Sequence, residues 1–439
     1  MASEKIVNRR ATVHTLGCRL NQSETNLIRD SLVAQGYSIV PFGDRADLAV
    51  INTCTVTRTA DSKCRSAIRQ FTRRNPKAFT AVVGCYSQMG YKEIAGIEGV
   101  DVIIGNQDKL NVLDYVGDGK NEVPVIVRDR IDREDFSITF AGELPFMQRA
   151  NLKIQDGCDF MCTFCIIPFA RGRARSRDFQ NLLGEAVNLV DRGVRELILT
   201  GVNLGTYSHH GKNIVDIVDS LDAIEGLSRI RISSIEPTTI PQALLERMKD
   251  PGHVLLPYLH IPLQAGSDEV LRSMRRKYNV SEYLSFVQKA GRLVQDLCIG
   301  TDIMVGFPGE TGNDFEQTCQ TFLEGPFAYC HVFTYSERDG TPAAKHKNSV
   351  PVPERKLRST HLRRLSAMKR HDFHESFLGR EFPVLFENQR EGVWPGYTPN
   401  YIRTVVPDAG EDLTNRLGLV RLDTVSADFV EGSLLELLD

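Results

Sequence analysis

The chain has 439 residues, a net charge of −3 and ten cysteines, and 25% of its residues are charged. That length suits about three domains, and the composition is typical of a soluble globular protein without general affinity for polyanions. Neither an apolar run of about 18 residues nor an apolar segment after the first charges is found, so we expect a cytoplasmic protein without a membrane span. In that compartment cysteines stay reduced, which favours metal ligands, nucleophiles or core residues over disulfides.

Residues 9–117 alternate apolar runs with polar stretches of helical period. The runs are ATVHTLG, DLAVIN, AFTAVVG and DVIIG, and the helical stretches begin near Gln22, Thr57 and Ser87. Alternation of this kind predicts an α/β domain built on a parallel sheet. Residues 118–146 lose the helical period and carry turn residues, which indicates a connecting arm.

A second alternating block, which we place at residues 147–376, contains six strand candidates: NLKIQ, RELILT, RIRISS, LLPYLH, IGTDIMVG and YCHVFT. Six βα units in a row predict a partial (βα)6 barrel. Residues 377–439 change character again, with the short strands EFPVLFE, YIRTVVP, LGLVRL and SLLELL set off by Gly, Pro and Asn. They predict a small C-terminal β-barrel.

Cys158, Cys162 and Cys165 form a Cys-x3-Cys-x2-Cys run directly after the strand NLKIQ. In a parallel barrel that position is the carboxyl rim, where active sites gather. Structural zinc takes four ligands, and no fourth Cys or His lies at a usual spacing. Three thiolates instead suit a four-iron cluster with one open iron, although a zinc knuckle remains an alternative.

Cys18, Cys54 and Cys85 are far apart in sequence, yet each follows an apolar strand and precedes a helical stretch. Parallel strands therefore bring all three thiols to one carboxyl edge, where open α/β sheets bind ligands. We expect a second cluster there, again with one exchangeable iron that holds a sulfide or methylsulfide; three unrelated thiols are the alternative. Cys64 and His260 are expected to be structural residues.

The segment DGCDFMCTFC closely resembles the radical S-adenosylmethionine superfamily. The resemblance implies that the open iron chelates the methionyl group of S-adenosylmethionine, whose one-electron cleavage gives a deoxyadenosyl radical, and this requires a strongly reducing cluster. By the same analogy Phe164 packs near the adenine, and Gly201 and Asn203 in TGVNLG lie in the loop that meets the methionyl amine. Gly306 and Gly309 end a strand where backbone approaches a ligand closely, or they form a simple Gly-Pro turn.

The whole chain resembles the methylthiotransferase family. The matching segments are TLGC-x-x-NQ-x-ET, NTCTVT, KIQDGC, CIIPFARG, SSIEP, HIPLQAGSDEVL and DIMVGFPGET, with Arg19 where lysine is frequent and Cys64 where serine is common. They look like the bacterial branch that modifies threonylcarbamoyladenosine beside the anticodon of transfer RNA (tRNA). This implies methylthiolation of carbon 2, two 4Fe-4S clusters, S-adenosylmethionine, the tRNA anticodon stem-loop as partner and a low-potential electron donor of flavodoxin or ferredoxin type.

The C-terminal segment resembles the TRAM module, an RNA-binding barrel. Stacking and phosphate contacts suit unpaired bases of an anticodon loop, although each aromatic is also a candidate for the barrel core. The candidates for RNA contact are Trp394, Tyr397, Tyr401, Arg390 and Arg403, together with Arg171, Arg173, Arg175 and Arg177 in the basic run after the cysteine motif.

Three alternatives stay open at this point: methylthiolation of isopentenyladenosine in tRNA, methylthiolation of an aspartate in a ribosomal protein, and a zinc-stabilised RNA-binding protein without catalysis. The sulfur source, the tRNAs modified and the oligomeric state are not fixed by the sequence.

Overall fold

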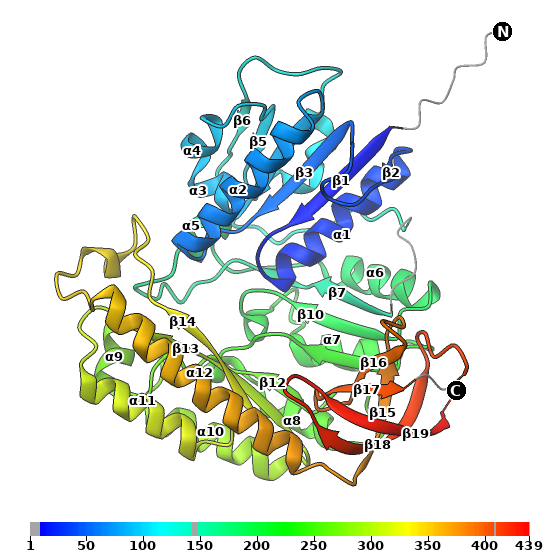
Figure 1. Cartoon of the computed structure of the whole chain (residues 1–439), viewed down its shortest axis with the longest axis vertical. Helices are drawn as coiled ribbons and strands as arrows, with labels where there is room; N and C mark the ends of the chain where they lie inside the picture. The colour runs from blue at the N-terminus through cyan, green and yellow to red at the C-terminus, as the bar shows by residue number, and fades with distance from the viewer. Residues whose placement is uncertain (1–8, 143–147, 408–409, 439) are drawn as a thin grey trace.

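The computed structural model describes residues 9–142, 148–407 and 410–438. Figure 1 shows an α/β part at the top, a partial barrel below it and a small β-barrel at the lower right. Residues 143–147, where we placed the end of the connecting arm and the start of the central domain, lie outside the described residues, as does Asp439. The domain boundaries therefore stay predictions.

The N-terminal part is a six-stranded sheet in the order β2-β1-β3-β4-β5-β6, with every neighbouring pair parallel. Every residue of β3 and β4 is buried, because helical segments cover both faces of the sheet. The elements are β1 (Arg10–Thr15), α1 (Arg19–Ala34), β2 (Ser38–Ile39), β3 (Leu48–Thr53), α2 (Arg58–Arg74), β4 (Phe79–Gly84), α3 (Cys85–Met89), α4 (Tyr91–Ala95), β5 (Val102–Ile104), η1 (Lys109–Tyr115) and β6 (Val125–Val127).

Strand β6 lies within the segment expected to be a connecting arm. It extends the sheet by one parallel strand beside β5, with Ile103 paired to Ile126. The strand has only three residues, and Val125 and Ile126 are exposed, so neither length nor periodicity marks it in the sequence.

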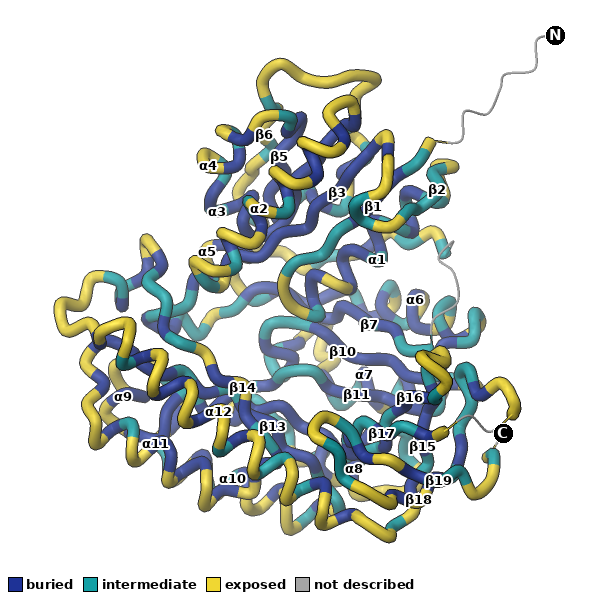
Figure 2. The backbone as a smooth tube through the Cα atoms, viewed as in Figure 1, coloured by how far each residue is buried: buried dark blue, intermediate teal, exposed yellow. Residues whose placement is uncertain are grey.

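The central part consists of two parallel three-stranded sheets, β11-β10-β7 and β12-β13-β14. A parallel bridge between Ile230 and Leu255 joins the two sheets, so the six predicted strands form one open barrel. Figure 2 shows β10 to β13 largely buried and the outer faces of α10, α11 and α12 exposed, whereas β14 alternates buried and exposed residues. The strands are β7 (Arg149–Lys153), β10 (Glu196–Thr200), β11 (Arg229–Ile232), β12 (Tyr258–His260), β13 (Cys298–Val305) and β14 (Tyr329–Thr334).

The helices of this part alternate with the strands, as the βα pattern predicts. Two short antiparallel strands, β8 (Gln155–Asp156) and β9 (Arg175–Ser176), flank the cysteine loop. The helical elements are α5 (Ile167–Arg171), α6 (Phe179–Asp191), η2 (Leu204–Thr206), α7 (Ile214–Asp222), η3 (Pro237–Thr239), α8 (Gln242–Lys249), α9 (Asp268–Ser273), α10 (Val280–Leu293), α11 (Gly312–Glu324), η4 (Pro342–Lys345) and α12 (Val352–Glu375).

The C-terminal part is a closed barrel in the order β15-β16-β17-β19-β18, which confirms the predicted three-part fold class. Its strands are β15 (Glu381–Phe386), β16 (Val393–Tyr397), β17 (Arg403–Pro407), β18 (Leu417–Val425) and β19 (Val430–Leu437). Strand β16 was not expected, because Pro395 and Gly396 are residues that strands disfavour.

The C-terminal barrel docks on β11 of the central barrel. The buried guanidinium of Arg229 donates to the carbonyl oxygens of Tyr397 and Pro383, each at 2.7 Å. Arg231 donates to the carbonyl of Pro399 at 3.1 Å. In the part of the chain that the structure describes, every helix is too short or too polar to cross a membrane.

Candidate active site

The loop that carries Cys158, Cys162 and Cys165 connects β8 to α5 at the carboxyl rim of the barrel. Gly157 has a φ of +71°, and a Cβ at that position would lie 1.9 Å from the carbonyl oxygen of Arg173. Only glycine allows this close approach, since the loop folds back and the amide of Cys158 donates to Gly172 at 3.1 Å.

The three thiols of this loop lie close enough to influence each other's titration. Burial raises the pKa of Cys158 to about 11 and that of Cys165 to about 12, and the neighbouring thiols add to both increases. Burial also raises the pKa of Cys162, but Arg276 opposes this increase, with its Nη1 at 3.3 Å from the Cys162 Sγ. A metal centre here would displace the thiol protons, and the Arg276 guanidinium favours the resulting thiolate.

Cys18, Cys54 and Cys85 meet at the carboxyl edge of the N-terminal sheet. Cys54 and Cys85 directly follow Thr53 and Gly84, which are paired across β3 and β4. Cys18 precedes α1, and a Cβ on the preceding Gly17, whose φ is +119°, would lie 2.8 Å from the Cβ of Cys54.

The thiols of this triad are also close enough to affect each other's pKa. Burial raises the pKa of Cys54 to about 12, and the thiols of Cys85 and Cys18 contribute to the increase. The structure thus brings together the three cysteines that the strand-end pattern predicted to meet. Cys64 lies beside them, with Sγ 3.4 Å from the carbonyl of Cys54, and is completely buried in the core.

The spacing of the thiols tests which metal centre fits. Among the described residues, two groups bring three ligand atoms within 4.8 Å of one another, and neither cysteine triad is one of them. A single zinc with Zn–S bonds of about 2.3 Å needs sulfurs within roughly 4.6 Å. Wider triads suit a multi-iron cluster, and the residues present fit that group better than zinc. The two groups are His260, Asp302 and His331, and His371, Asp372 and Glu375.

Asn106 links the two cysteine loops. Its Nδ2 lies 3.5 Å from the Sγ of Cys85 and donates to the carbonyl of Ala170 at 2.6 Å. Ala170 belongs to α5, which begins two residues after Cys165. The Asn106 amide therefore contacts a thiol of the N-terminal triad (Cys18, Cys54 and Cys85) and the helix that follows the triad of the central barrel.

Arg338, in the loop after β14, makes a second link. It donates to Thr55, beside Cys54, and to Asp61 at 2.6 Å each. Further along the same loop, the amide of Ala343 donates to the carbonyl of Thr163 at 2.9 Å. Arg338 and Asn106 could not be predicted from the sequence, because neither belongs to a cysteine motif.

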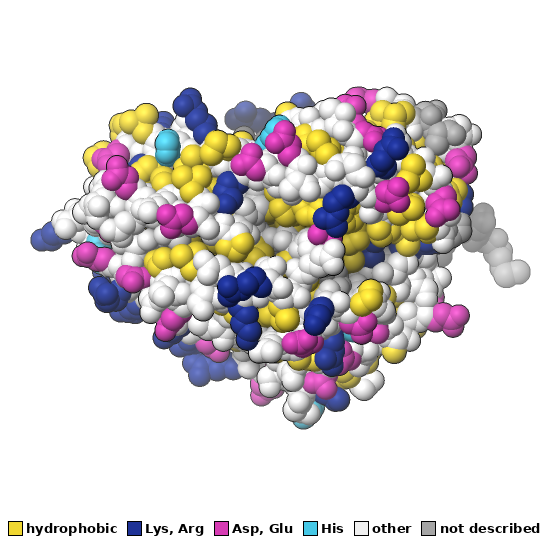
Figure 3. Space-filling model, turned by 90° about the horizontal axis from the view of Figure 1, so that it is seen from below, with side chains coloured by type: hydrophobic (Ala, Val, Ile, Leu, Met, Phe, Trp, Pro, Cys, Tyr) yellow, Lys and Arg dark blue, Asp and Glu magenta, His cyan; other side chains and the backbone are white. Residues whose placement is uncertain are grey.

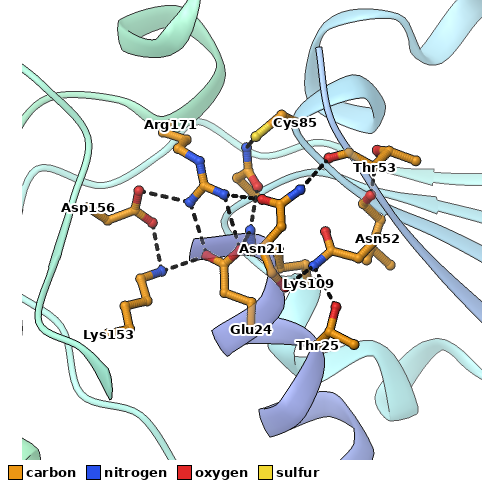
Figure 4. A network of polar contacts seen from close by, with 12 residues as sticks. Asn21, Glu24, Thr25, Asn52, Thr53, Cys85, Lys109, Lys153, Asp156 and Arg171 are labelled. Atoms are coloured by element: carbon orange, nitrogen blue, oxygen red, sulfur yellow. Dashed lines mark hydrogen bonds and ion pairs between the residues drawn. The ribbon is translucent and has the colours of Figure 1, made fainter. Parts of the chain in front are cut away.

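A buried ionic network of residues from α1, η1, β7, β8 and α5 lies near Cys85 (Figure 4). Glu24 of α1 accepts from Arg171 at 3.0 Å and from Lys153 at 2.8 Å, and it also pairs with Lys109. Asp156 pairs with Lys153 at 2.7 Å and with Arg171 at 3.0 Å. Arg175 lies 4.0 Å from Asp156 as well, so four cations face two carboxylates and two positive charges are in excess.

The excess positive charge of this network lies on the side of the N-terminal triad. Arg171 lies near Cys85, and Lys109 donates at 2.8 Å to Asn106, the residue that contacts the Cys85 thiol. Burial and Arg171 lower the pKa of Lys109 to about 8. A buried positive environment favours thiolates and an anionic cluster over neutral thiols.

Asn203 follows β10 and is almost completely buried. Its Oδ1 accepts from the hydroxyl of Thr239 at 2.9 Å and from the amide of Glu236 at 3.3 Å, whereas its Nδ2 is buried without a hydrogen-bond partner. An unpaired buried N–H group can donate to an oxygen atom of a bound ligand, and the contact with the methionyl amine that the resemblance implies stays a prediction. The loop is held by Gln155, whose Oε1 accepts from the amides of Val202 and Asn203.

Glu236, in the loop after β11, completes this side of the site. It is ion-paired with Arg276, whose Nε donates to the hydroxyl of Tyr278 at 3.1 Å. Burial raises the pKa of Glu236 although Arg276 opposes the change. A Cβ on Gly201 would lie 2.8 Å from Leu204 and 2.9 Å from Gln155, so the loop packs tightly there.

The glycines after β13 differ from each other. A Cβ on Gly306 would lie 2.3 Å from the Cγ of Arg355, so this glycine serves internal packing. Gly309 has open space within 4 Å of that position. Phe307, which lies between these two glycines in the sequence, contacts Phe164 edge to face, with ring centroids 6.5 Å apart.

Two family models match the chain. Residues 152–322 match the radical SAM superfamily, and residues 10–105 match the uncharacterized protein family UPF0004. The threonylcarbamoyladenosine tRNA methylthiotransferase MtaB of Bacillus subtilis (strain 168) is 36% identical over 97% of this chain and 96% of its own. The chain belongs to the radical S-adenosylmethionine methylthiotransferase family.

Other members of the methylthiotransferase family match comparably. The MtaB protein of Aquifex aeolicus (strain VF5) is 37% identical over 88% of this chain and 94% of its own. A tRNA-2-methylthio-N(6)-dimethylallyladenosine synthase of Maricaulis maris (strain MCS10) is 31% identical over 97% of both chains. Among solved structures, the radical S-adenosylmethionine methyltransferase TsrM from Kitasatospora setae has a TM-score of 0.53 at 14% identity over 77% of each chain, which supports the fold.

The basic run after the cysteine motif is mostly unable to contact a phosphate, contrary to the sequence-based expectation for this family member. Arg171 is 1% exposed within the ionic network, and Arg177 is completely buried and paired with Glu185. Arg175 is buried over the ring of Phe136. Arg173 alone of the four is exposed, beside Asp159 at 3.5 Å.

The C-terminal candidates also need correction. Trp394 is 5% exposed in the barrel core, so it offers no stacking face. Tyr397 and Tyr401 stack on each other at 5.0 Å and lie under Arg149 and Arg231, at the contact with the central barrel.

Arg390 is exposed, and Arg403 is half-buried at the edge of a cavity. Seen from the side opposite the N-terminal part, basic and acidic side chains are interspersed on the surface (Figure 3). That face therefore does not resemble an electrostatic track for RNA.

Proposed function

We propose that this protein transfers a methylthio group to carbon 2 of N6-threonylcarbamoyladenosine beside the anticodon of tRNA. One observation carries the proposal: Asn106 and Arg338 link two cysteine triads. One triad lies at the carboxyl edge of the N-terminal sheet, and the other lies at the carboxyl rim of the central barrel. The names of the relatives with 36% and 37% identity support this substrate.

Cys158, Cys162 and Cys165 would hold a 4Fe-4S cluster that binds S-adenosylmethionine, and Cys18, Cys54 and Cys85 would hold a second 4Fe-4S cluster. When bound, these groups would supply a carbon-centred radical and a site that holds the sulfur for transfer. The chain itself contributes thiolate stabilisation by Arg276 and a free hydrogen-bond donor on Asn203. Glu236 keeps the Arg276 guanidinium directed at Cys162 through their ion pair.

The proposal also includes the RNA substrate and the electron donor. The substrate is the anticodon stem-loop, and a low-potential electron donor of flavodoxin or ferredoxin type supplies single electrons in the cytoplasm. Arg173 and Arg390 remain exposed candidates for phosphate contact.

Nucleoside mass spectrometry tests the proposal. In tRNA from cells that lack the gene, threonylcarbamoyladenosine should lose its methylthio mass, and the wild-type gene should restore it. A triple variant with Cys18, Cys54 and Cys85 changed to Ala should fail to restore it. Loss of the methylthio group from isopentenyladenosine, or from a ribosomal-protein aspartate, would instead select one of those substrates.

The radical step has its own assay. Changing Cys158, Cys162 and Cys165 together to Ala should abolish formation of deoxyadenosine from S-adenosylmethionine by reduced enzyme. Continued formation by that variant would refute the assignment of the cluster.

A further inference from the structure

A cavity of about 320 Å³ lies where the N-terminus of α1, strands β12 to β14, α12 and the C-terminal barrel meet. Arg19 lines it from α1, directly after Cys18 in the chain. Tyr258 and Tyr401 line it from the two barrels. Arg19 therefore links the cavity to Cys18 along the chain, although none of Cys18, Cys54 and Cys85 is among the described lining residues.

Arg19 is the unusual residue of this cavity. Its Nη2 donates to the hydroxyl of Tyr401, and the guanidinium lies 5.5 Å from the centre of that ring. Its Nη1 is buried without a hydrogen-bond partner. Among the described residues, no carboxylate forms an ion pair with Arg19 at 4.0 Å or less, and a buried cation without an anion is costly.

The other charged residues of the cavity are mostly basic. Arg370 is ion-paired at 3.0 Å with Asp428, which is the one acidic residue among the described lining residues. Arg403 also lines the cavity and forms no ion pair with a described carboxylate. Three guanidinium groups therefore face one carboxylate, which leaves two positive charges uncompensated.

We propose that this cavity binds the carboxylate of the threonyl substituent, with Arg19 as the residue that contacts it; the inference rests on the proposed function. In N6-threonylcarbamoyladenosine the threonine is attached through its amino nitrogen, so its carboxylate and hydroxyl are free. A guanidinium binds a carboxylate through two parallel hydrogen bonds, and the unpaired Nη1 supplies one of them.

The same charges disfavour an isopentenyl substituent. An apolar chain would displace water from Arg19 and Arg403 without replacing its hydrogen bonds, which costs binding free energy. A carboxylate compensates one of the two excess positive charges and accepts hydrogen bonds from a guanidinium group. The cavity therefore favours an anionic substituent on N6 over an apolar one.

The test uses reconstituted full-length enzyme and two anticodon stem-loop RNAs that carry either the threonylcarbamoyl group or its carboxamide analogue. Wild-type enzyme should methylthiolate the acid with a kcat/KM roughly 10- to 100-fold above the amide, which is the range for a hydrogen bond to a charged group. Arg19→Gln should lose that factor on the acid and treat both RNAs alike. Arg19→Lys should recover part of the preference, and the exposed Arg364→Gln is the control that should match wild type.

Two further measurements keep the result interpretable. Iron content shows whether Arg19→Gln still carries both clusters, since Arg19 follows Cys18. Fluorescence anisotropy gives the affinity for both RNAs even where turnover is absent, so failure of the proposed reaction remains distinguishable from failure of this site. An Arg19→Gln variant that prefers the acid as strongly as wild type, in turnover and in binding, overturns the inference.

Discussion

Glu24 of α1 and Arg171 of α5 form an ion pair at 3.0 Å in which both side chains are at most 2% exposed. Glu24 belongs to the part of the chain that carries Cys18, and Arg171 follows Cys165 by six residues. Although burial acts in the opposite direction, Arg171, Lys109 and Lys153 hold the pKa of Glu24 well below its usual range. The pair therefore ties the two cysteine triads together through a contact that water does not reach.

Breaking this pair should weaken the whole interface. Glu24→Gln leaves Arg171 and two lysines without their shared anion, and removal of one partner of a buried pair costs about 3–5 kcal/mol. We expect the first urea-induced unfolding transition to fall accordingly. Arg247→Met is the matched control, because its pair with Asp219 is exposed and such pairs contribute about 0–1 kcal/mol. Equal losses of stability in both variants would show that the buried network stabilises the fold no more than an exposed ion pair does.

Acid should destabilise the fold through the same carboxylates. Burial alone would raise the pKa of Glu196, but Arg231 and Arg149 lower it to about 2, and the pKa values of Glu24 and Asp156 are lowered as well. These groups bind protons more weakly in the folded state, so their stabilisation is complete above the unfolded value of 4.5 for Glu and is lost as the pH falls towards 2.

Urea midpoints measured from pH 7 to pH 3 check this expectation. Stability should be nearly constant down to about pH 5 and then decline, with a smaller decline in Glu24→Gln. A midpoint that is independent of pH over this range contradicts the role of the buried carboxylates.

Arg276 should tune the reduction potential of the cluster at Cys162. Its N–H group lies 3.3 Å from Sγ, and hydrogen bonds to cluster sulfurs raise the potential by stabilising the more negative, reduced state. Arg276→Lys keeps a cation beside Glu236 but loses the planar geometry, so the potential should become more negative. An electron paramagnetic resonance titration measures it, and Arg275→Lys, an exposed neighbour, should leave it unchanged. An unchanged potential in Arg276→Lys argues against the contact.

Trp394 should matter for stability rather than for stacking on bases. It packs with Val384, Phe386 and Val420 inside the C-terminal barrel. Trp394→Ala should cost about 3–5 kcal/mol as a large-to-small core substitution. Trp394→Phe should keep the barrel folded and leave the affinity for the anticodon stem-loop within about twofold of wild type; a large loss of affinity in that variant would place Trp394 at the RNA after all.

The positions of the cysteines follow from the sequence because they depend on a local rule. Each thiol lies within three residues of the end of a strand, and parallel strands end at one edge, so Cys18, Cys54 and Cys85 meet even though they are far apart in the chain. The barrel strands were predictable for the same reason, since βα alternation is visible over short windows.

Long-range partners and burial could not be predicted in the same way. The basic run suggested phosphate contacts, but Arg171 finds Glu24 at a separation of 147 residues and Arg177 is enclosed by the fold. Arg338 meets Thr55 across 283 residues. Such pairings depend on how the parts pack, and charge density along the chain does not reveal which side chains remain exposed.

The iron and sulfide content of oxygen-free protein tests the central claim most directly. Two four-iron clusters predict about eight irons and eight sulfides per chain, and about four of each when Cys18, Cys54 and Cys85, or Cys158, Cys162 and Cys165, are changed to Ala. Zinc in place of iron, or the same iron content in wild type and in either triple variant, would contradict two clusters held by these triads.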